Sequence, residues 1–157
     1  MLARRLFLTA AVSLIALPAA AQDYKLGSLE ITTPWTRATA PTARSGGGFM
    51  TITNKGTTAD RLISARSTAS DKVEIHEMQM DGSVMRMREL AKGLDIPPGA
   101  TVLLKPGSYH IMFMELKAPL AKDAKVPLTL VFEKAGSIDV QLNVEAMGAM
   151  PQGHGKN

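Results

Sequence analysis

Apolar and polar residues alternate with a period of two along most of the chain after residue 25, as they do in half-buried β-strands. Helical periodicity is scarce, and turn signals such as Asp81-Gly82 and Pro106-Gly107 separate the alternating segments. So many short strands in one small domain predict an all-β fold, an antiparallel Greek-key barrel or sandwich. The predicted strands are 26–32, 48–54, 61–66, 73–80, 84–89, 101–105, 109–116, 126–133 and 138–144.

Two segments depart from this alternation. Residues 33–48 contain two prolines and a triple glycine, so they are predicted to form a long ordered loop that includes Trp35 and Arg37. Within that loop we expect Trp35 to close one end of the barrel as a structural side chain. Residues 146–157 are rich in glycine and lack a strand pattern, so we expect a flexible tail.

The first 21 residues have the pattern of an export signal. Arg4 and Arg5 precede an apolar stretch, which ends at Pro18 and three alanines. We therefore expect a signal peptide at 1–21, a single domain at 22–145 and the tail at 146–157. The paired arginines also fit a twin-arginine route, although they occur in ordinary signals as well. No apolar run after residue 22 approaches the roughly 20 residues needed to span a bilayer.

Charge and cysteine content exclude several classes of protein. The chain has 18 Lys and Arg against 14 Asp and Glu, and the two signs are interleaved rather than clustered. Nucleic-acid binding is excluded for practical purposes, because it requires a concentrated basic patch. The cysteine count is zero, which excludes disulfides, thiol nucleophiles, cysteine zinc sites, cysteine-held iron–sulfur clusters and blue-copper centres.

Methionine and histidine concentrate in one part of the chain. His76 and His110 each begin an H-x-M-x-M segment, and alternate residues of a strand share one face. Each segment therefore presents one imidazole and two thioethers on the same side. Of the ten methionines, the following lie in this part: Met78, Met80, Met85, Met87, Met112 and Met114.

A hairpin is predicted to bring the first group together. If Asp81-Gly82 forms a two-residue type I′ turn, Met78 lies opposite Met85, and His76 lies opposite Met87. Directly opposed residues have Cβ atoms about 4.5–5.5 Å apart, so an imidazole and a thioether would reach one ion. A longer turn would change this register.

The donor types select the metal. Thioether sulfur is a soft, neutral ligand that suits Cu(I), and imidazole suits copper generally. Methionine does not form disulfides, so a site without cysteine is suited to an oxidising compartment. The two H-x-M pairs favour His76, Met87, His110 and Met112 as ligands, with Met78 as a substitute. Any single methionine in a β protein is more often a core residue, and we expect this of Met50.

These residues also carry a resemblance to a known family. The chain resembles the periplasmic copper chaperones of the PCu(A)C type, which have a cupredoxin-like β fold. Their metal motif is a His, ten residues, a Met, twenty-odd residues and then His-x-Met, and it falls here on His76, Met87, His110 and Met112. The matching segments include Pro34-Trp35-Thr36-Arg37-Ala38, Gly47-Gly48-Phe49-Met50, Val73-Glu74-Ile75-His76-Glu77-Met78 and Pro106-Gly107-Ser108-Tyr109-His110-Ile111-Met112.

The resemblance implies a periplasmic carrier that delivers Cu(I) to the copper-bearing subunit of cytochrome oxidase or to another periplasmic copper carrier. Some relatives carry a His- and Met-rich C-terminal extension that binds a further copper, often Cu(II). Met147, Met150 and His154 look like a short version of it.

Three alternatives remain open at this stage. The chain could be a metal-free β-domain that docks on a periplasmic partner through its methionines, or a general periplasmic copper buffer. A copper enzyme is disfavoured, because soft neutral ligands disfavour Cu(II) and a redox cycle requires both oxidation states. We expect a carrier that does no chemistry on a substrate.

Overall fold

The computed structural model describes residues 22–151, and every regular element in that range is a β-strand. The predicted all-β class is thereby confirmed. No helix in the described part of the chain is long and apolar enough to cross a bilayer. The strands are β1 (Tyr24–Leu26), β2 (Leu29–Arg37), β3 (Ser45–Asn54), β4 (Asp60–Arg66), β5 (Ser70–Asp81), β6 (Val84–Glu89), β7 (Leu94–Ile96), β8 (Thr101–Leu104), β9 (His110–Leu116), β10 (Lys125–Phe132) and β11 (Gly136–Glu145).

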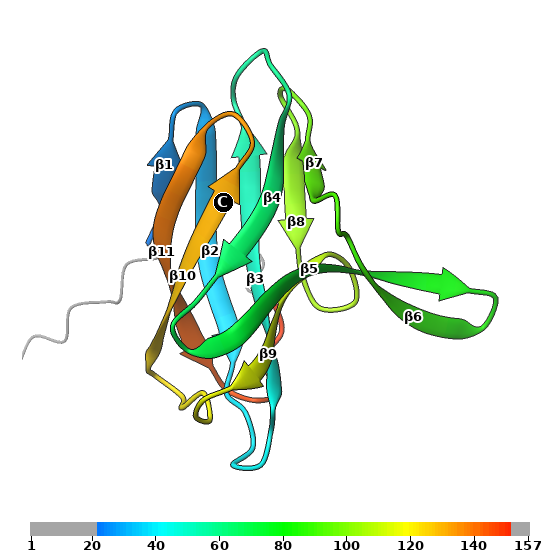
Figure 1. The fold of residues 1–157 in the computed structure, drawn as a ribbon, viewed down its shortest axis with the longest axis vertical. Helices are drawn as coiled ribbons and strands as arrows, with labels where there is room; N and C mark the ends of the chain where they lie inside the picture. Colours follow the sequence, from blue (N-terminus) through cyan, green and yellow to red (C-terminus); the bar gives the residue numbers. More distant parts are fainter. Residues whose placement is uncertain (1–21, 152–157) are drawn as a thin grey trace, which may run out of the picture.

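The strands form one continuous hydrogen-bonded sheet in the order β6-β5-β9-β3-β2-β11-β10-β4-β7, with β1 added to β2 and β8 added to β3. All pairings are antiparallel except β2 with β11. The sheet curls over on itself, so that β4 and β10 lie in front of β2 and β3 (Figure 1). Buried side chains from both layers, such as Ile52, Leu62, Phe113 and Phe132, form the core between them.

The sheet positions β5 and β9 together at one side of the molecule. β3 uses the same edge twice, since Ser45–Gly48 pair with β9 and Met50–Thr53 pair with β8. Beyond β9, β5 continues past the body of the sheet and returns as β6, and this hairpin projects to one side (Figure 1). β6 ends the sheet, and all six of its residues are exposed.

The prediction of a long loop at 33–48 is wrong in its bounds, because strands cover both ends of this segment. β2 continues to Arg37 and β3 begins at Ser45, so Trp35 and Arg37 lie in a strand. The register of β2 against β3 shifts between Thr32 and Trp35, and Thr33 has a φ of 50°, so an irregularity absorbs the proline without ending the strand.

The triple glycine is also inside β3 rather than in a turn. A Cβ added at Gly48 would lie 2.9 Å from Leu142 Cδ2 and 3.0 Å from Phe113 Cε2. Glycine is required there because neighbouring side chains approach the backbone closely, a recognised role of glycine within strands. The strands β1 and β7 were not predicted as separate elements, because three residues are too few to show a period.

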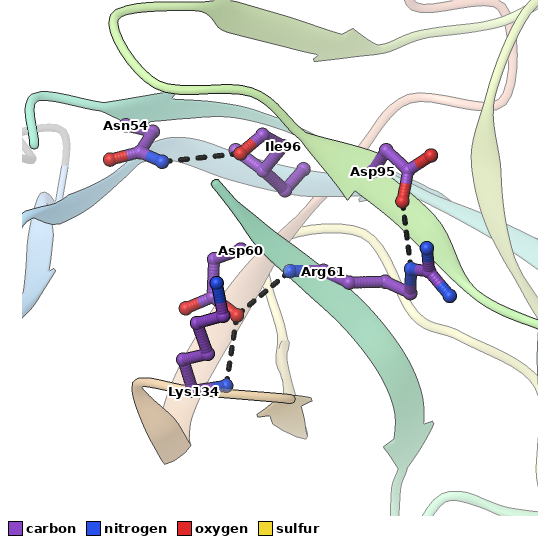
Figure 2. Close-up of polar contacts among 6 residues, drawn as sticks. All are labelled: Asn54, Asp60, Arg61, Asp95, Ile96 and Lys134. Carbon is purple, nitrogen blue, oxygen red and sulfur yellow. Dashed lines mark hydrogen bonds and ion pairs between the residues drawn. The ribbon is translucent and has the colours of Figure 1, made fainter. Parts of the chain in front are cut away.

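A buried carboxylate fixes the loop between β10 and β11 against β4. Asp60 Oδ1 accepts hydrogen bonds from the backbone N–H groups of Arg61 at 2.7 Å and Lys134 at 3.0 Å, as Figure 2 shows, and Oδ2 accepts a third from Ala135. Burial raises the pKa of Asp60, but these three hydrogen bonds lower it by more, so the pKa lies below its ordinary value. Nearby, Asn54 donates to the carbonyl of Ile96 at 3.1 Å and joins β3 to β7 (Figure 2).

Candidate metal site on the outer face of β5 and β9

The sequence-predicted site residues of β5 and β9 share the face that points away from the core. Ile75 and Ile111 lie directly opposite each other and belong to the core cluster. Their neighbours in each strand therefore point outward, because successive side chains alternate between the two faces. His76 and Met78 of β5 lie on this outer face, together with His110 and Met112 of β9.

His76 and His110 are cross-strand partners. Their ring centroids are 5.7 Å apart, and the planes meet at 71°. His76 is 8% exposed and His110 is 5% exposed, so the two imidazoles form a largely desolvated pair. The structure therefore brings together the two histidines that are 34 positions apart in the sequence.

A backbone carbonyl orients the ring of His110. His110 Nδ1 donates to the carbonyl oxygen of Ser108 at 3.0 Å, and the same oxygen accepts from the backbone N–H of Met78 at 3.2 Å. This bond places the proton of the neutral ring on Nδ1, so the lone pair is on Nε2. Burial lowers the pKa of His110 by more than the Ser108 bond raises it, which favours the neutral, ligating form of the ring.

A carboxylate orients the ring of His76. Glu74, two residues earlier on the same face, accepts a hydrogen bond from His76 Nε2 at 2.6 Å, and it also pairs with Lys72. The hydrogen bonds from Lys72 and His76 hold the pKa of Glu74 below its ordinary value, so Glu74 is a carboxylate at neutral pH. The other nitrogen, His76 Nδ1, is buried and has no hydrogen-bond partner among residues 22–151. An orphaned buried lone pair is costly, and a soft metal ion would satisfy it.

Met112 follows His110 by two residues and is half-buried. It lies between two cross-strand partners, Glu74 of β5 and Gly47 of β3. Gly47 has no side chain, and the Phe49 ring of β3 occupies the space next to it, since a Cβ added at Gly47 would lie 2.9 Å from Phe49 Cζ. Met112 is therefore flanked by β5 and β3, and it is the diagonal neighbour of His76 on the outer face.

Met87 is on the same face, but the predicted hairpin register is wrong. The structure pairs Asp81 with Val84, Met78 with Met87 and His76 with Glu89. The turn residues are thus Gly82 and Ser83, and only Gly82 has a positive φ, at 63°. This suits a type II′ turn, which needs glycine at its first central position, whereas the predicted type I′ turn would also require a positive φ at Asp81.

The correction shifts β6 by two residues, so every side chain keeps its predicted face. Met87 lies opposite Met78 rather than opposite His76, which is two residues farther along β5 from the body of the sheet than predicted. It is the diagonal neighbour of His76. Met78, expected as a substitute ligand, therefore lies between His76 and Met87. Met87 is 48% exposed, so this side of the group opens to solvent.

Aromatic rings flank the histidine pair on the side of β3. The Phe49 ring lies 6.5 Å from His110 and 4.7 Å from Trp35, and both aromatic residues are buried outside the main core cluster. Trp35 was expected to be a structural plug at the end of the barrel. The structure places it on the same outer face, where it supports Phe49. The Arg37 guanidinium lies 5.9 Å from the Trp35 ring centroid and 6.0 Å from that of Phe49.

Part of the C-terminal segment contacts this aromatic group. Arg37 Nε donates to the carbonyl of Ala149 at 2.8 Å, and its Nη2 lies 3.8 Å from the sulfur of Met150. Met147 and Met150 are 64% and 70% exposed. His154, the third residue expected at a tail site, lies outside the described residues.

Glu74 is the site residue that the sequence reasoning missed. The period of two that groups His76 with Met78 also places Glu74 beside His76, so the signal was present in the E-x-H-x-M spacing. Within residues 22–151, no group of three or more His, Cys, Asp or Glu side chains converges as a metal site.

Comparison with known proteins identifies the family of this chain. A family model described as "Putative lipoprotein LpqE-like" matches residues 29–144. The chain belongs to the LpqE-like family. A relative, "Putative lipoprotein Lxx21020" of Leifsonia xyli subsp. xyli (strain CTCB07), is 31% identical over 131 residues, which cover 82% of this chain and 78% of that protein.

Solved structures share the fold of this LpqE-like chain. The apo PCuAC domain from PmoF1 is 26% identical, with a TM-score of 0.69, and the match covers 80% of this chain and 99% of that domain. The copper-bound PCuAC domain from PmoF2 is also 26% identical, with a TM-score of 0.68, over 80% of this chain and 98% of that domain. The predicted resemblance to the PCu(A)C family and its cupredoxin-like β fold is confirmed.

Proposed function

We propose that this chain is an exported copper carrier that binds Cu(I) through His76, Met87, His110 and Met112. The observation that carries the proposal is the cross-strand apposition of His76 and His110, with ring centroids 5.7 Å apart. In each ring one nitrogen is engaged by a protein acceptor, which leaves the other for an ion: Nδ1 of His76 and Nε2 of His110. Acceptors that bind the nitrogen of a histidine facing away from the metal fix the orientation of its ring in metal sites.

The donor set supports Cu(I) as the cargo. Two neutral imidazoles and two neutral thioethers give a hard cation no charge to neutralise, whereas Cu(I) prefers soft donors. The copper-bound PCuAC domain from PmoF2 supports copper as the metal. Met78 is the substitute thioether, since it lies between His76 and Met87.

The gradient of exposure supports a carrier rather than a sealed storage site. The histidines are almost fully buried, while Met87 is half exposed at the hairpin side. An acceptor could displace the Met87 thioether first and then withdraw the ion from the histidines by ligand exchange. No substrate chemistry is involved, so the proposal assigns no enzymatic activity.

The destination proposed from the family resemblance is the copper-bearing subunit of cytochrome oxidase, or another copper carrier, in the periplasm. The leader pattern of residues 1–21 and a relative named as a lipoprotein support export. A metal-free docking domain and a general copper buffer are the competing functions.

X-ray absorption on protein loaded with less than one equivalent of Cu(I) tests the ligand set directly. We expect two nitrogen and two sulfur scatterers around copper. A shell without sulfur would contradict the thioether ligands, and failure to retain Cu(I) against a chromophoric chelator would favour the metal-free docking domain. Transfer to an isolated oxidase copper domain, followed by its absorption spectrum, would separate a delivery protein from a buffer.

A further inference from the structure

The β5–β6 hairpin carries more methionine than the proposed copper site uses. Its paired positions Met78–Met87 and Met80–Met85 place four thioethers on one face, in two consecutive pairs. We call these four residues the hairpin methionines. They lie on the same face as His76, farther from the body of the sheet, in the projecting part of the hairpin (Figure 1).

Core packing does not explain these residues. Met80 and Met85 are 58% and 51% exposed, and among the strands that the structure describes β6 hydrogen-bonds only to β5. A methionine that fills a core gap is buried, as Met50 is at 2% exposure. The apolar face of the hairpin is therefore held in solvent.

The opposite face of the hairpin has a different chemistry. Glu77 pairs with Arg88 at 2.8 Å, and Asp81 pairs with Arg86 at 2.8 Å. The charged groups thus neutralise each other on one face, and the other face beyond the His76–Glu89 pair presents only thioethers. On the methionine face, the charged residue of the hairpin between residues 76 and 89 is Glu89, the cross-strand partner of His76.

From this arrangement we infer a second Cu(I) site formed by Met78, Met80 and Met85. Met80 and Met85 are directly opposed, which puts their Cβ atoms about 4.5–5.5 Å apart, and Met78 is the diagonal neighbour on the same face. Three rotatable bonds in each side chain allow the sulfurs to converge on one ion. Three neutral thioethers form a soft site that selects Cu(I) over harder cations.

The second site would lie on the route to the first. The Met78–Met87 pair lies between His76 and the Met80–Met85 pair. Met87 belongs to the proposed copper site, and Met78 belongs to the inferred second site. An ion captured at the exposed end of the hairpin could pass to the buried histidines by replacing thioethers one at a time. Imidazole donors are absent from the outer site, so it binds copper more weakly than the inner site.

Titration with Cu(I) under ascorbate against a chromophoric chelator tests the inference. We expect a tight first equivalent and a weaker second equivalent in the wild-type protein, and loss of only the second in Met80→Leu/Met85→Leu. Leucine keeps the apolar surface and nearly the same volume but removes the donor sulfur. Met147→Leu/Met150→Leu tests the tail as the source of the second equivalent. The matched control is Met50→Leu, which removes a thioether that is 2% exposed in the core and should retain both equivalents.

A reporter at each residue separates this inference from the proposed function. With methyl-labelled methionine and redox-inert Ag(I), the second equivalent should shift the NMR signals of Met78, Met80 and Met85 but not that of buried Met50. A His76→Ala/His110→Ala variant should lose the tight equivalent and keep these shifts; loss of the shifts would overturn an independent outer site. The inference would be overturned if the wild-type protein took up only one equivalent of Cu(I). It would also be overturned if Met80→Leu/Met85→Leu kept the second equivalent, or if only the tail variant lost that equivalent.

Discussion

His76 and His110 face each other across β5 and β9 with their ring centroids 5.7 Å apart, although neither ring hydrogen-bonds to the other. The His76 ring instead hydrogen-bonds to the Glu74 carboxylate, and the His110 ring hydrogen-bonds to the Ser108 carbonyl. The pair is therefore set in position before any ion arrives. Preorganised ligands bind more tightly because less ordering remains to be done on binding.

Removing either a buried or an exposed ligand should weaken Cu(I) binding. We expect His110→Ala and Met87→Ala each to lower the affinity for the first equivalent, measured by chelator competition, while circular dichroism shows an intact β fold. Because Met87 is half exposed, Met87→Leu should change the free energy of unfolding by no more than about 0.5 kcal/mol. Unchanged affinity in both alanine variants would contradict the proposed ligand set.

Glu74 should act on copper through His76. We expect Glu74→Ala to weaken Cu(I) binding by about 10–100-fold, the usual effect of removing an acceptor behind a ligating imidazole. Glu74→Gln keeps a hydrogen-bond acceptor and should retain most of the affinity. ¹⁵N NMR of the His76 ring checks the cause, since the proton should stay on Nε2 in wild type and in Glu74→Gln but redistribute in Glu74→Ala. An unaltered tautomer in Glu74→Ala would contradict the positioning role.

Gly47 should be required for the aromatic support of His110. A Cβ at this position would lie 2.9 Å from Phe49 Cζ, so Gly47→Ala must displace the ring that lies 6.5 Å from His110. We expect a destabilisation of about 1–3 kcal/mol, typical of overpacking, together with weaker Cu(I) binding. The matched control is Gly46→Ala, whose Cβ would meet the flexible end of Leu120 at 3.2 Å and should leave copper affinity unchanged.

Asp60 should make the fold sensitive to acid. The pKa of Asp60 is lower in the folded protein than in the unfolded chain. The ionised carboxylate therefore stabilises the fold at pH values above the ordinary pKa of Asp, about 3.9. This stabilisation is lost as the pH falls through the lowered pKa of the folded protein. Asp60→Asn should destabilise the protein at pH 7 by about 1–3 kcal/mol, because an amide cannot accept all three N–H groups. It should also flatten the pH dependence of urea unfolding in the acid range.

Asp95 provides the control for that measurement. It pairs with Arg61 Nε at 2.7 Å (Figure 2), but its side chain is 73% exposed. An exposed ion pair contributes about 0–1 kcal/mol, so Asp95→Asn should have a small effect at any pH. Equal acid sensitivity in Asp60→Asn and wild type would show that the buried carboxylate does not govern acid unfolding.

The sequence predicted the fold class and most strands because alternation survives wherever one face of the sheet is buried. The segment 109–116 differs from β9 by one residue, and 101–105 differs from β8 by one residue. The prediction failed at 33–48, where proline and glycine usually mark a loop. There, tertiary contacts decide the outcome: parallel pairing with β11 holds Trp35 in a strand, and close packing against Phe113 selects Gly48.

The candidate site was predictable in composition but not in register. Period two and the H-x-M spacing placed the histidines and methionines on common faces, and a two-residue register error left those faces unchanged. The turn was misassigned because Asp-Gly and Gly-Ser are both good hairpin turns, and no local signal chooses between them. The pairing of His76 with His110 depends on the pairing of β5 with β9, a long-range contact that local sequence patterns could not predict.

The isolation of β6 has a consequence for how such proteins diversify. Because β6 is fully exposed and pairs with a single neighbour in the described part of the chain, replacing its side chains leaves the interior of the molecule untouched. Natural selection can therefore change the chemistry of this projecting arm without endangering the scaffold that holds the two imidazoles.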